Sequence, residues 1–112
     1  MGDLQVETNK SLLTMNTMAL ASSAEYFCSV STINEVKKAL SFAREHDLSV
    51  TPLGAGSNVV LASNLSGLVV HLALKGWEST VPLGIASGFV DVTFAAGENW
   101  HDMVVMCLDK GW

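Results

Sequence analysis

Hydrophobic periodicity predicts a strand–helix–strand unit in the first half of the chain. Residues 24–31 alternate weakly and are rich in aromatic and β-branched side chains, which is typical of a strand. Thr32, with Glu35 three positions later, has the pattern of a capping box that opens a helix. One apolar stripe at helical spacing follows, formed by Ile33, Val36, Ala39, Leu40 and Ala43. The helix should end near His46, and residues 48–53 should form a second strand, which implies a parallel pair.

The flanking segments are less regular. Residues 1–15 show no clear period and are expected to be a loose lead-in. Residues 58–63 and 67–74 look extended, with a turn between them, whereas 76–88 carries proline and glycine and should be turn-rich. Residues 89–97 alternate and predict a further strand.

The last element is the clearest predicted helix. Asn99 is a plausible N-cap, and Gly111 is a plausible residue just beyond the C-cap. The spacing i, i+3, i+4, i+7 and i+8 predicts a single buried stripe made of Trp100, Met103, Val104, Cys107 and Leu108.

Composition limits the chain to one small core. With 112 residues, 49% of them hydrophobic and 15% charged, the chain is apolar for its size compared with an ordinary soluble domain. This imbalance fits a piece of a larger protein, and it predicts marginal stability and a tendency to self-associate.

Charge and cysteine usage exclude several classes of function. The net charge is −5 and the six basic residues are scattered, so we expect no nucleic acid partner. Cys28 and Cys107 lie far apart without a C-x-x-C motif, so we predict no metal site and no redox pair. They are interpreted as small apolar residues.

The sequence predicts a cytoplasmic protein without a membrane span. The longest uncharged run, 11–24, contains several polar residues and cannot cross a bilayer. "ALASSA" at 19–24 resembles a signal-peptidase site, but the segment before it is acidic and lacks an apolar core.

The stretch "LGAGSNVVL" at 53–61 is the candidate binding loop. One interpretation is that Gly54 and Gly56 only allow positive φ in a tight turn. The other is that successive backbone N–H groups form a nest for an anion, with Ser57 and Asn58 at its rim. The loop is followed by strand-forming residues and no lysine, so it matches neither a Walker A loop nor a dinucleotide fingerprint that opens a helix.

The sequence resembles a known family of flavoenzymes. "NTM" at 16–18, "PLGAGSNVVLASNLSGLVVHL" at 52–72 and "VTFAAGENWHDMVVMCLDKGW" at 92–112 resemble the N-terminal FAD-binding region of UDP-N-acetylenolpyruvoylglucosamine reductase, also called UDP-N-acetylmuramate dehydrogenase. The resemblance runs from about residue 16 to the end of the chain and covers roughly the first third of such an enzyme.

The resemblance implies an α+β fold of the vanillyl-alcohol-oxidase (PCMH) type. A small βαβ subdomain at about 24–54 would be followed by part of a mixed or antiparallel sheet and a C-terminal helix, within a partial FAD-binding domain at 16–112. By the same resemblance the loop wraps the FAD pyrophosphate, and its contacts are Gly54, Ala55, Gly56, Ser57 and Asn58. A diphosphate would approach the main chain there more closely than a Cβ permits.

The resemblance also implies limits. NADPH is the reductant and a UDP-sugar the substrate in the full-length family, but the substrate domain and catalytic residues belong to portions that this sequence does not contain. We therefore expect no complete catalysis from this chain alone. Two alternatives stay open, namely another FAD-linked oxidoreductase of the same superfamily and a non-catalytic interaction module that retains the fold.

Overall fold

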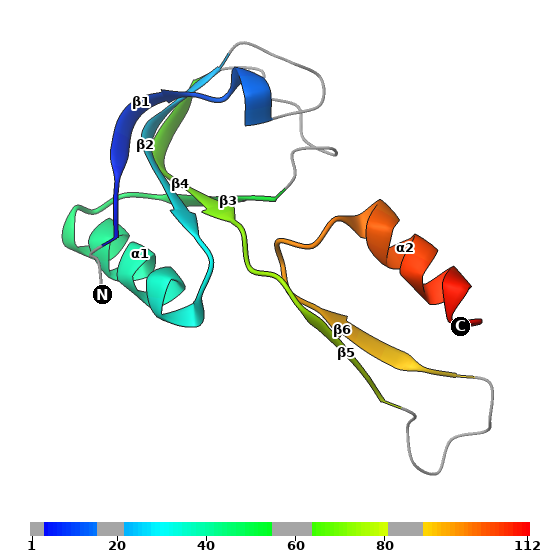
Figure 1. Cartoon of the computed structure of the whole chain (residues 1–112). Helices are drawn as coiled ribbons and strands as arrows, with labels where there is room; N and C mark the ends of the chain where they lie inside the picture. The colour runs from blue at the N-terminus through cyan, green and yellow to red at the C-terminus, as the bar shows by residue number, and fades with distance from the viewer. Residues whose placement is uncertain (1–3, 16–21, 55–63, 81–88) are drawn as a thin grey trace.

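The structure is a computed structural model, which describes residues 4–15, 22–54, 64–80 and 89–112. Within these ranges the regular elements form one four-stranded sheet and one two-stranded sheet, with two α-helices (Figure 1). In chain order they are β1 (Glu7–Ser11), the 3-10 helix η1 (Leu13–Met15), β2 (Ser23–Val30), α1 (Ile33–Glu45), β3 (Val50–Leu53), β4 (Leu65–Leu72), β5 (Trp77–Thr80), β6 (Asp91–Phe94) and α2 (Trp100–Asp109). The α+β class is confirmed.

The four-stranded sheet has the order β1-β2-β4-β3. Strands β2 and β3 run parallel as predicted, but they do not pair with each other, because each pairs with β4 from opposite sides. The physical reason lies in β4, whose Leu68, Val69 and Val70 are all buried and suit a central position. Strand β3 contains Pro52, which has no N–H to donate to a ladder and is tolerated at an edge.

Each face of this sheet has its own core. Helix α1 covers one face, where Cys28, Val30, Leu68 and Val70 pack against Ala39 and Ala43. The opposite face is closed by the chain around η1, and its buried cluster consists of Leu12, Ala24, Phe27, Leu53 and Val69. Figure 1 shows α1 on one side of the sheet and η1 on the other.

The N-terminal segment differs from the loose lead-in that its sequence predicts. Strand β1 pairs antiparallel with β2, from Glu7 opposite Phe27 to Ser11 opposite Ser23. Its residues are polar and mostly exposed, so the backbone ladder and not a hydrophobic pattern holds it in place. Leu12 follows and is fully buried, which anchors this edge of the sheet.

The predicted capping box at the start of α1 is present with a small shift. The Thr32 hydroxyl oxygen accepts a hydrogen bond from the Glu35 backbone N–H at 3.1 Å. The Glu35 carboxylate accepts from the backbone N–H of Ser31, one residue earlier than the usual partner, at 2.9 Å. The helix ends at Glu45 with His46 as C-cap, as its sequence predicts.

Strands β5 and β6 form a separate antiparallel hairpin beyond the end of β4. Strand β6 lies within the predicted strand at 89–97, whereas β5 falls in the segment predicted to be turn-rich. Two aromatic contacts join this hairpin to the C-terminal part of the chain. Phe94 meets Trp100 of α2 at 6.4 Å, and Trp77 meets Trp112, which follows α2, at 6.2 Å between ring centroids.

The predicted caps of α2 are confirmed, but its buried stripe is not. The Asn99 side chain accepts a hydrogen bond from the Asp102 N–H, and Gly111 has φ 76° at the other end. Of the five stripe residues only Met103 is buried, while Trp100 is 74% and Leu108 is 68% exposed. The spacing identifies an apolar face, but burial needs a partner element that covers this face, and most of the stripe remains exposed.

Neither α-helix in the described part of the chain is long and apolar enough to cross a membrane.

Candidate functional site

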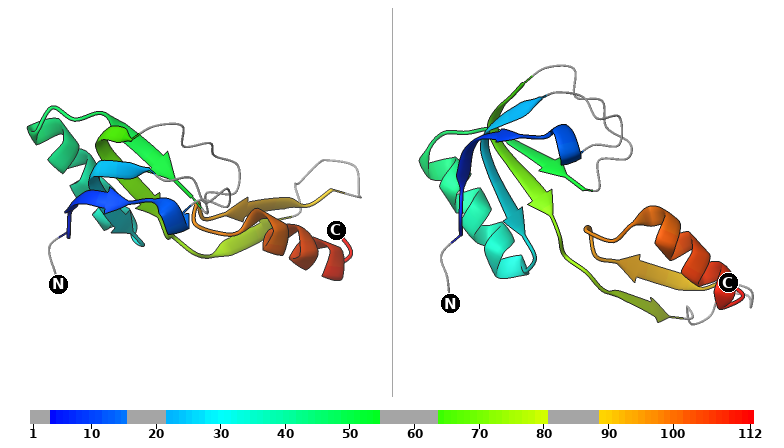
Figure 2. Two further views of the ribbon diagram at one scale, coloured as in Figure 1. Left: turned by 90° about the horizontal axis from the view of Figure 1, so that it is seen from above. Right: turned by 45° about the horizontal axis from the view of Figure 1, so that its top comes forward.

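The candidate site begins at one edge of the four-stranded sheet. Strands β2, β4 and β3 are parallel, so their carboxyl ends lie along the same edge. Such an edge is where open parallel sheets bind ligands, because loops and free backbone groups gather there. The candidate loop leaves β3 at this edge, directly after Leu53. The connection between β6 and α2 comes close to this edge, whereas the β5–β6 hairpin and α2 themselves extend away from the sheet (Figure 2).

Gly54, the first predicted site residue, has few neighbours beside its main chain among the described residues. Within that part of the chain, and apart from its adjacent residues, a Cβ built on Gly54 would meet the carbonyl oxygen of Ala96 at 4.0 Å, an ordinary van der Waals contact. Its φ is outside the left-handed region, so the need for a positive φ does not explain this glycine. The other four predicted contacts, Ala55, Gly56, Ser57 and Asn58, lie outside the described residues.

The segment opposite Gly54 is held tightly in place. The Gly97 N–H donates to the Leu74 carbonyl oxygen at 2.9 Å, and the Lys75 ammonium donates to the Gly97 carbonyl oxygen at 2.6 Å. The Gly76 N–H donates to the Glu98 carboxylate at 2.6 Å. These bonds join the connection between β6 and α2 to the segment between β4 and β5. We call these two segments, residues 74–76 and 96–98, the junction.

The junction was not predicted from sequence. Lys75 carries no motif that would place it next to Gly97, since the two belong to different strand connections 22 positions apart. The string "GENWH" is explained structurally at two positions, because Glu98 binds the Gly76 N–H and Asn99 caps α2. His101 is on the exposed surface of α2, which is the expected default for a polar helix residue.

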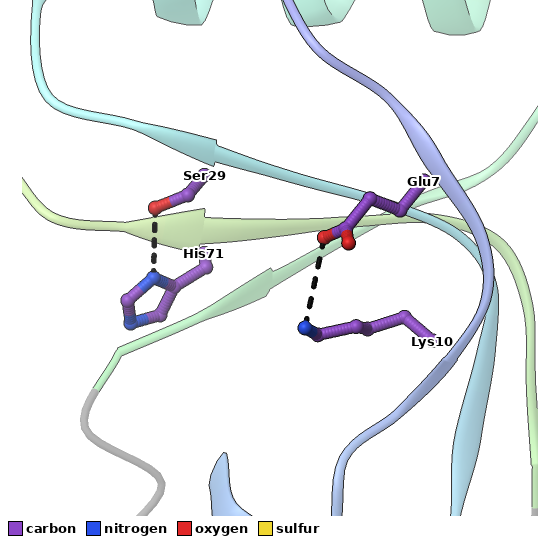
Figure 3. A network of polar contacts seen from close by, with 4 residues as sticks. All are labelled: Glu7, Lys10, Ser29 and His71. Atoms are coloured by element: carbon purple, nitrogen blue, oxygen red, sulfur yellow. Dashed lines mark hydrogen bonds and ion pairs between the residues drawn. The ribbon is translucent and has the colours of Figure 1, made fainter.

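His71 lies on β4 beside the candidate loop. Its Nδ1 is 2.9 Å from the Ser29 hydroxyl oxygen on the neighbouring strand β2, and its ring stacks on Phe27 with 19° between the planes. Figure 3 shows this pair on the same side of the sheet as the ion pair between Lys10 and Glu7, whose atoms are 3.7 Å apart.

The surroundings of His71 favour its neutral form. Partial burial, followed by the positive charge of Lys75, lowers the pKa of His71 below its usual 6.5. A histidine that is neutral at physiological pH can donate a hydrogen bond from one ring nitrogen while the other accepts one.

The lowered pKa of His71 predicts a pH dependence of stability. The unfolded chain binds a proton on His71 at a higher pH than the folded chain does. The contribution of neutral His71 to the free energy of unfolding is therefore complete above the usual pKa of 6.5, and it is lost as the pH falls through the lowered pKa of the folded state. We expect the free energy of unfolding to fall more steeply from about pH 7 to about pH 5 in the unaltered chain than in His71→Gln. Urea denaturation at several pH values measures the difference, and parallel curves would contradict the prediction.

Comparison with known proteins defines the class of this chain. Residues 24–112 match the model of the FAD binding domain family, so the chain belongs to that family. FAD is therefore its cofactor. The FAD-binding fold of the vanillyl-alcohol-oxidase (PCMH) type, predicted from the sequence, agrees with membership of this family.

Individual relatives narrow the relationship. The chain is 30% identical to UDP-N-acetylenolpyruvoylglucosamine reductase of Amoebophilus asiaticus over 97% of its own length and 31% of the relative's. It is 32% identical to the same reductase of Flavobacterium johnsoniae, again over 97% of this chain and 31% of the relative. For Bordetella pertussis the identity is 38% over 87% of this chain and 26% of the relative. The resemblance to the FAD-binding region of this reductase is confirmed, and the chain spans about a third of such a relative or less.

The described residues fit FAD at this edge of the sheet. A dinucleotide needs close approach to the backbone, hydrogen-bond donors and positive charge near its diphosphate. Gly54 has no side chain to obstruct such an approach, and His71, which lies opposite Leu53, has a ring nitrogen on which the charge of the Lys75 ammonium acts. When bound, FAD supplies hydride-transfer chemistry, while the protein supplies binding, orientation and electrostatics.

Proposed function

We propose that this chain binds the diphosphate of FAD along residues 54–58. Of these five residues, Gly54 belongs to the part of the chain that the structure describes. The observation that carries the proposal is the position of Gly54 on the carboxyl edge of three parallel strands, where no described atom beyond its adjacent residues lies closer than 4.0 Å to a Cβ position. Family membership supports the identity of the ligand. The binding groups would be main-chain amides, with Ser57 and Asn58 adding side-chain donors.

We further propose that the chain is the FAD-binding portion of an enzyme that reduces UDP-N-acetylglucosamine enolpyruvate to UDP-N-acetylmuramate in peptidoglycan synthesis. The names of the relatives support this reaction class. The reductant would be NADPH, and the UDP-sugar would bind to residues beyond the third of the enzyme represented here. A cytoplasmic location follows from the nature of these substrates.

The activity proposal predicts complementation. The chain alone should not oxidise NADPH in the presence of the enolpyruvyl substrate. Adding the remaining portion of a related reductase should restore this oxidation if the proposed reaction is right. A complemented protein that binds FAD but oxidises another substrate would favour a different FAD-linked oxidoreductase instead.

We also propose that the isolated chain self-associates. Several large apolar side chains are exposed, with Trp100 at 74%, Leu108 at 68% and Phe89 at 65%. Exposed apolar surface of this kind drives association in water. A single sharp monomeric elution peak at micromolar concentrations would contradict this proposal.

Replacing Gly54 with Ala tests the binding site directly. Among the described residues, and apart from the adjacent ones, the added Cβ meets no atom closer than 4.0 Å, so we expect the free energy of unfolding to stay the same or to rise slightly. FAD affinity should fall by about tenfold or more, because the Cβ occupies the space that the diphosphate needs. Titration of flavin fluorescence measures the affinity, and urea denaturation provides the control for folding.

Flavin binding by the unaltered chain and by Gly54→Ala distinguishes an FAD-binding portion from a non-catalytic module. An unaltered purified chain with flavin absorption and quenched flavin fluorescence supports FAD binding by this portion alone. A well-folded chain that ignores FAD would favour a non-catalytic module that retains the fold. If Gly54→Ala retains full affinity, the assignment of the diphosphate to this loop is wrong.

A further inference from the structure

His71 is placed next to the candidate loop by the register of the sheet. Strand β3 pairs with β4 so that Leu53 lies opposite His71, and Gly54 is the next residue along the chain. The side chain of His71 is on the face away from α1, where it stacks on Phe27 with 6.3 Å between ring centroids. In Figure 3 the ring extends from the carboxyl end of β4, clear of the Lys10–Glu7 pair.

Two contacts fix the orientation of this ring. Phe27 sets its plane, and the Ser29 hydroxyl engages Nδ1 at 2.9 Å. The remaining nitrogen, Nε2, has no hydrogen-bond partner within the described residues. If the Ser29 hydroxyl donates to Nδ1, the neutral imidazole carries its proton on Nε2, which then becomes a donor available to a ligand.

The electrostatic surroundings favour an anion at this nitrogen. Lys75 is close enough to His71 for its positive charge to lower the pKa of the ring. One of the ammonium N–H groups of Lys75 donates to the Gly97 carbonyl oxygen, and the other two have no partner among the described residues. Gly97 follows Ala96, whose carbonyl oxygen is the nearest described atom, beyond the adjacent residues, to the Cβ position of Gly54. Gly54, His71 and Lys75 therefore border the same small region between the sheet and the junction.

The sequence of β4 makes this histidine unusual. It interrupts an apolar run, GLVVHLAL, in which the neighbouring Val70 is buried. The ring is only half-buried, and Ser29 engages one of its nitrogens, so the other nitrogen faces accessible space that a ligand could enter.

We propose that His71 binds the diphosphate of FAD, with Nε2–H donating a hydrogen bond to a phosphate oxygen and Lys75 supplying positive charge beside it. Ser29 is a positioning residue in this arrangement, because it acts through Nδ1 of the ring. The inference rests on the proposed FAD-binding function and adds a side-chain ligand to a site otherwise built from main-chain amides.

Two substitutions of His71 provide a matched test in the full chain. His71→Leu removes both nitrogens while keeping apolar volume, and His71→Gln keeps an N–H donor at the distance of Nε2. We expect His71→Leu to bind FAD about tenfold more weakly, the loss typical of one hydrogen bond to a charged group. His71→Gln should stay within about twofold of the unaltered chain.

ADP serves as a second probe because it contains a diphosphate without a flavin. The loss caused by His71→Leu should be similar for FAD and ADP when each is titrated by calorimetry. Ser29→Ala, at an exposed position, should weaken binding of both probes less than His71→Leu does, and it should leave thermal unfolding unchanged.

The results distinguish this inference from the function on which it rests. If the unaltered chain binds neither probe, the proposed function and the inference both fail. If the unaltered chain binds FAD and His71→Leu binds it equally well, only the inference is overturned. A loss confined to FAD would place the contact on the flavin half and would also overturn it. Rescue by His71→Gln supports a donor role that a purely structural histidine would not show.

Discussion

Replacing Gly67 with Ala is expected to lower the free energy of unfolding by about 4 kcal/mol. Gly67 has φ 82°, and a Cβ added to it would lie 2.5 Å from the carbonyl oxygen of Ser49. The substitution therefore combines left-handed backbone strain with a clash against main chain. Urea denaturation followed by circular dichroism measures the loss.

The need for glycine at this position comes from an irregularity in the sheet. From Ala24 to Tyr26, β2 advances by two residues while its partner β4 advances from Leu65 to Leu68 by three. The extra residue in β4 bulges, and the Gly67 N–H donates to the Glu25 carboxylate at 2.7 Å. The Leu68 N–H donates to the Ser49 carbonyl oxygen, which holds the backbone of Ser49 against Gly67.

A matched variant separates the two causes of destabilisation. Gly111 also has a positive φ, 76°, but a Cβ there would meet nothing within 4 Å. Gly111→Ala should therefore cost only the backbone strain, about 1 kcal/mol. Removing the Ser49 hydroxyl with Ser49→Ala should rescue Gly67→Ala only slightly, since the carbonyl oxygen remains. Equal losses for Gly67→Ala and Gly111→Ala would show that the close contact is unimportant.

Local signals in the sequence predicted the helices well because helix ends are determined locally. The Thr32–Glu35 pair and the Asn99 cap each satisfy N–H groups within a few residues of themselves. Strand pairing depends on distant residues, so β1 and β5 were missed. Both are short and mostly exposed, and neither shows a period that burial would impose.

The apolar stripes show what periodicity cannot supply. In α1, Ala39 and Ala43 are buried as predicted, whereas Ile33 is 62% and Leu40 is 47% exposed. In α2 most of the stripe is exposed. A helical pattern identifies which side chains share a face, but the element that covers this face is a tertiary property, and in α2 Met103 is buried while the rest of the stripe is not.

The candidate site was predictable only in part. The glycine loop is a local motif, and its location after β3 at the edge of the sheet agrees with the predicted strand at 48–53. The register between β3 and β4 places His71 opposite Leu53, next to this loop. Lys75 is held near the same edge by its hydrogen bond to Gly97 in the junction. Neither arrangement leaves a signal in residue spacing, because β4 inserts between two strands that precede it in the chain.

Replacing Gly97 with Ala is expected to have the second large effect, because Gly97 is the point of closest approach in the junction. A Cβ there would lie 2.5 Å from the Leu74 carbonyl oxygen and 2.6 Å from the Leu74 nitrogen. Both are main-chain atoms, so neither can move aside without breaking the Gly97–Leu74 hydrogen bond. We expect a loss of about 3 kcal/mol in the free energy of unfolding, measured by urea denaturation.

The same substitution should weaken FAD binding by a different route from Gly54→Ala. Displacing Gly97 moves the carbonyl oxygen that holds Lys75 and shifts Ala96 away from Gly54, so the positive charge and the wall of the proposed site are lost together. Gly54→Ala leaves these contacts intact and only fills the space beside the main chain. Gly97→Ala should therefore lose both stability and affinity, whereas Gly54→Ala should lose affinity alone. If Gly97→Ala is destabilised but binds FAD normally under folding conditions, the junction supports the fold and has no part in the site.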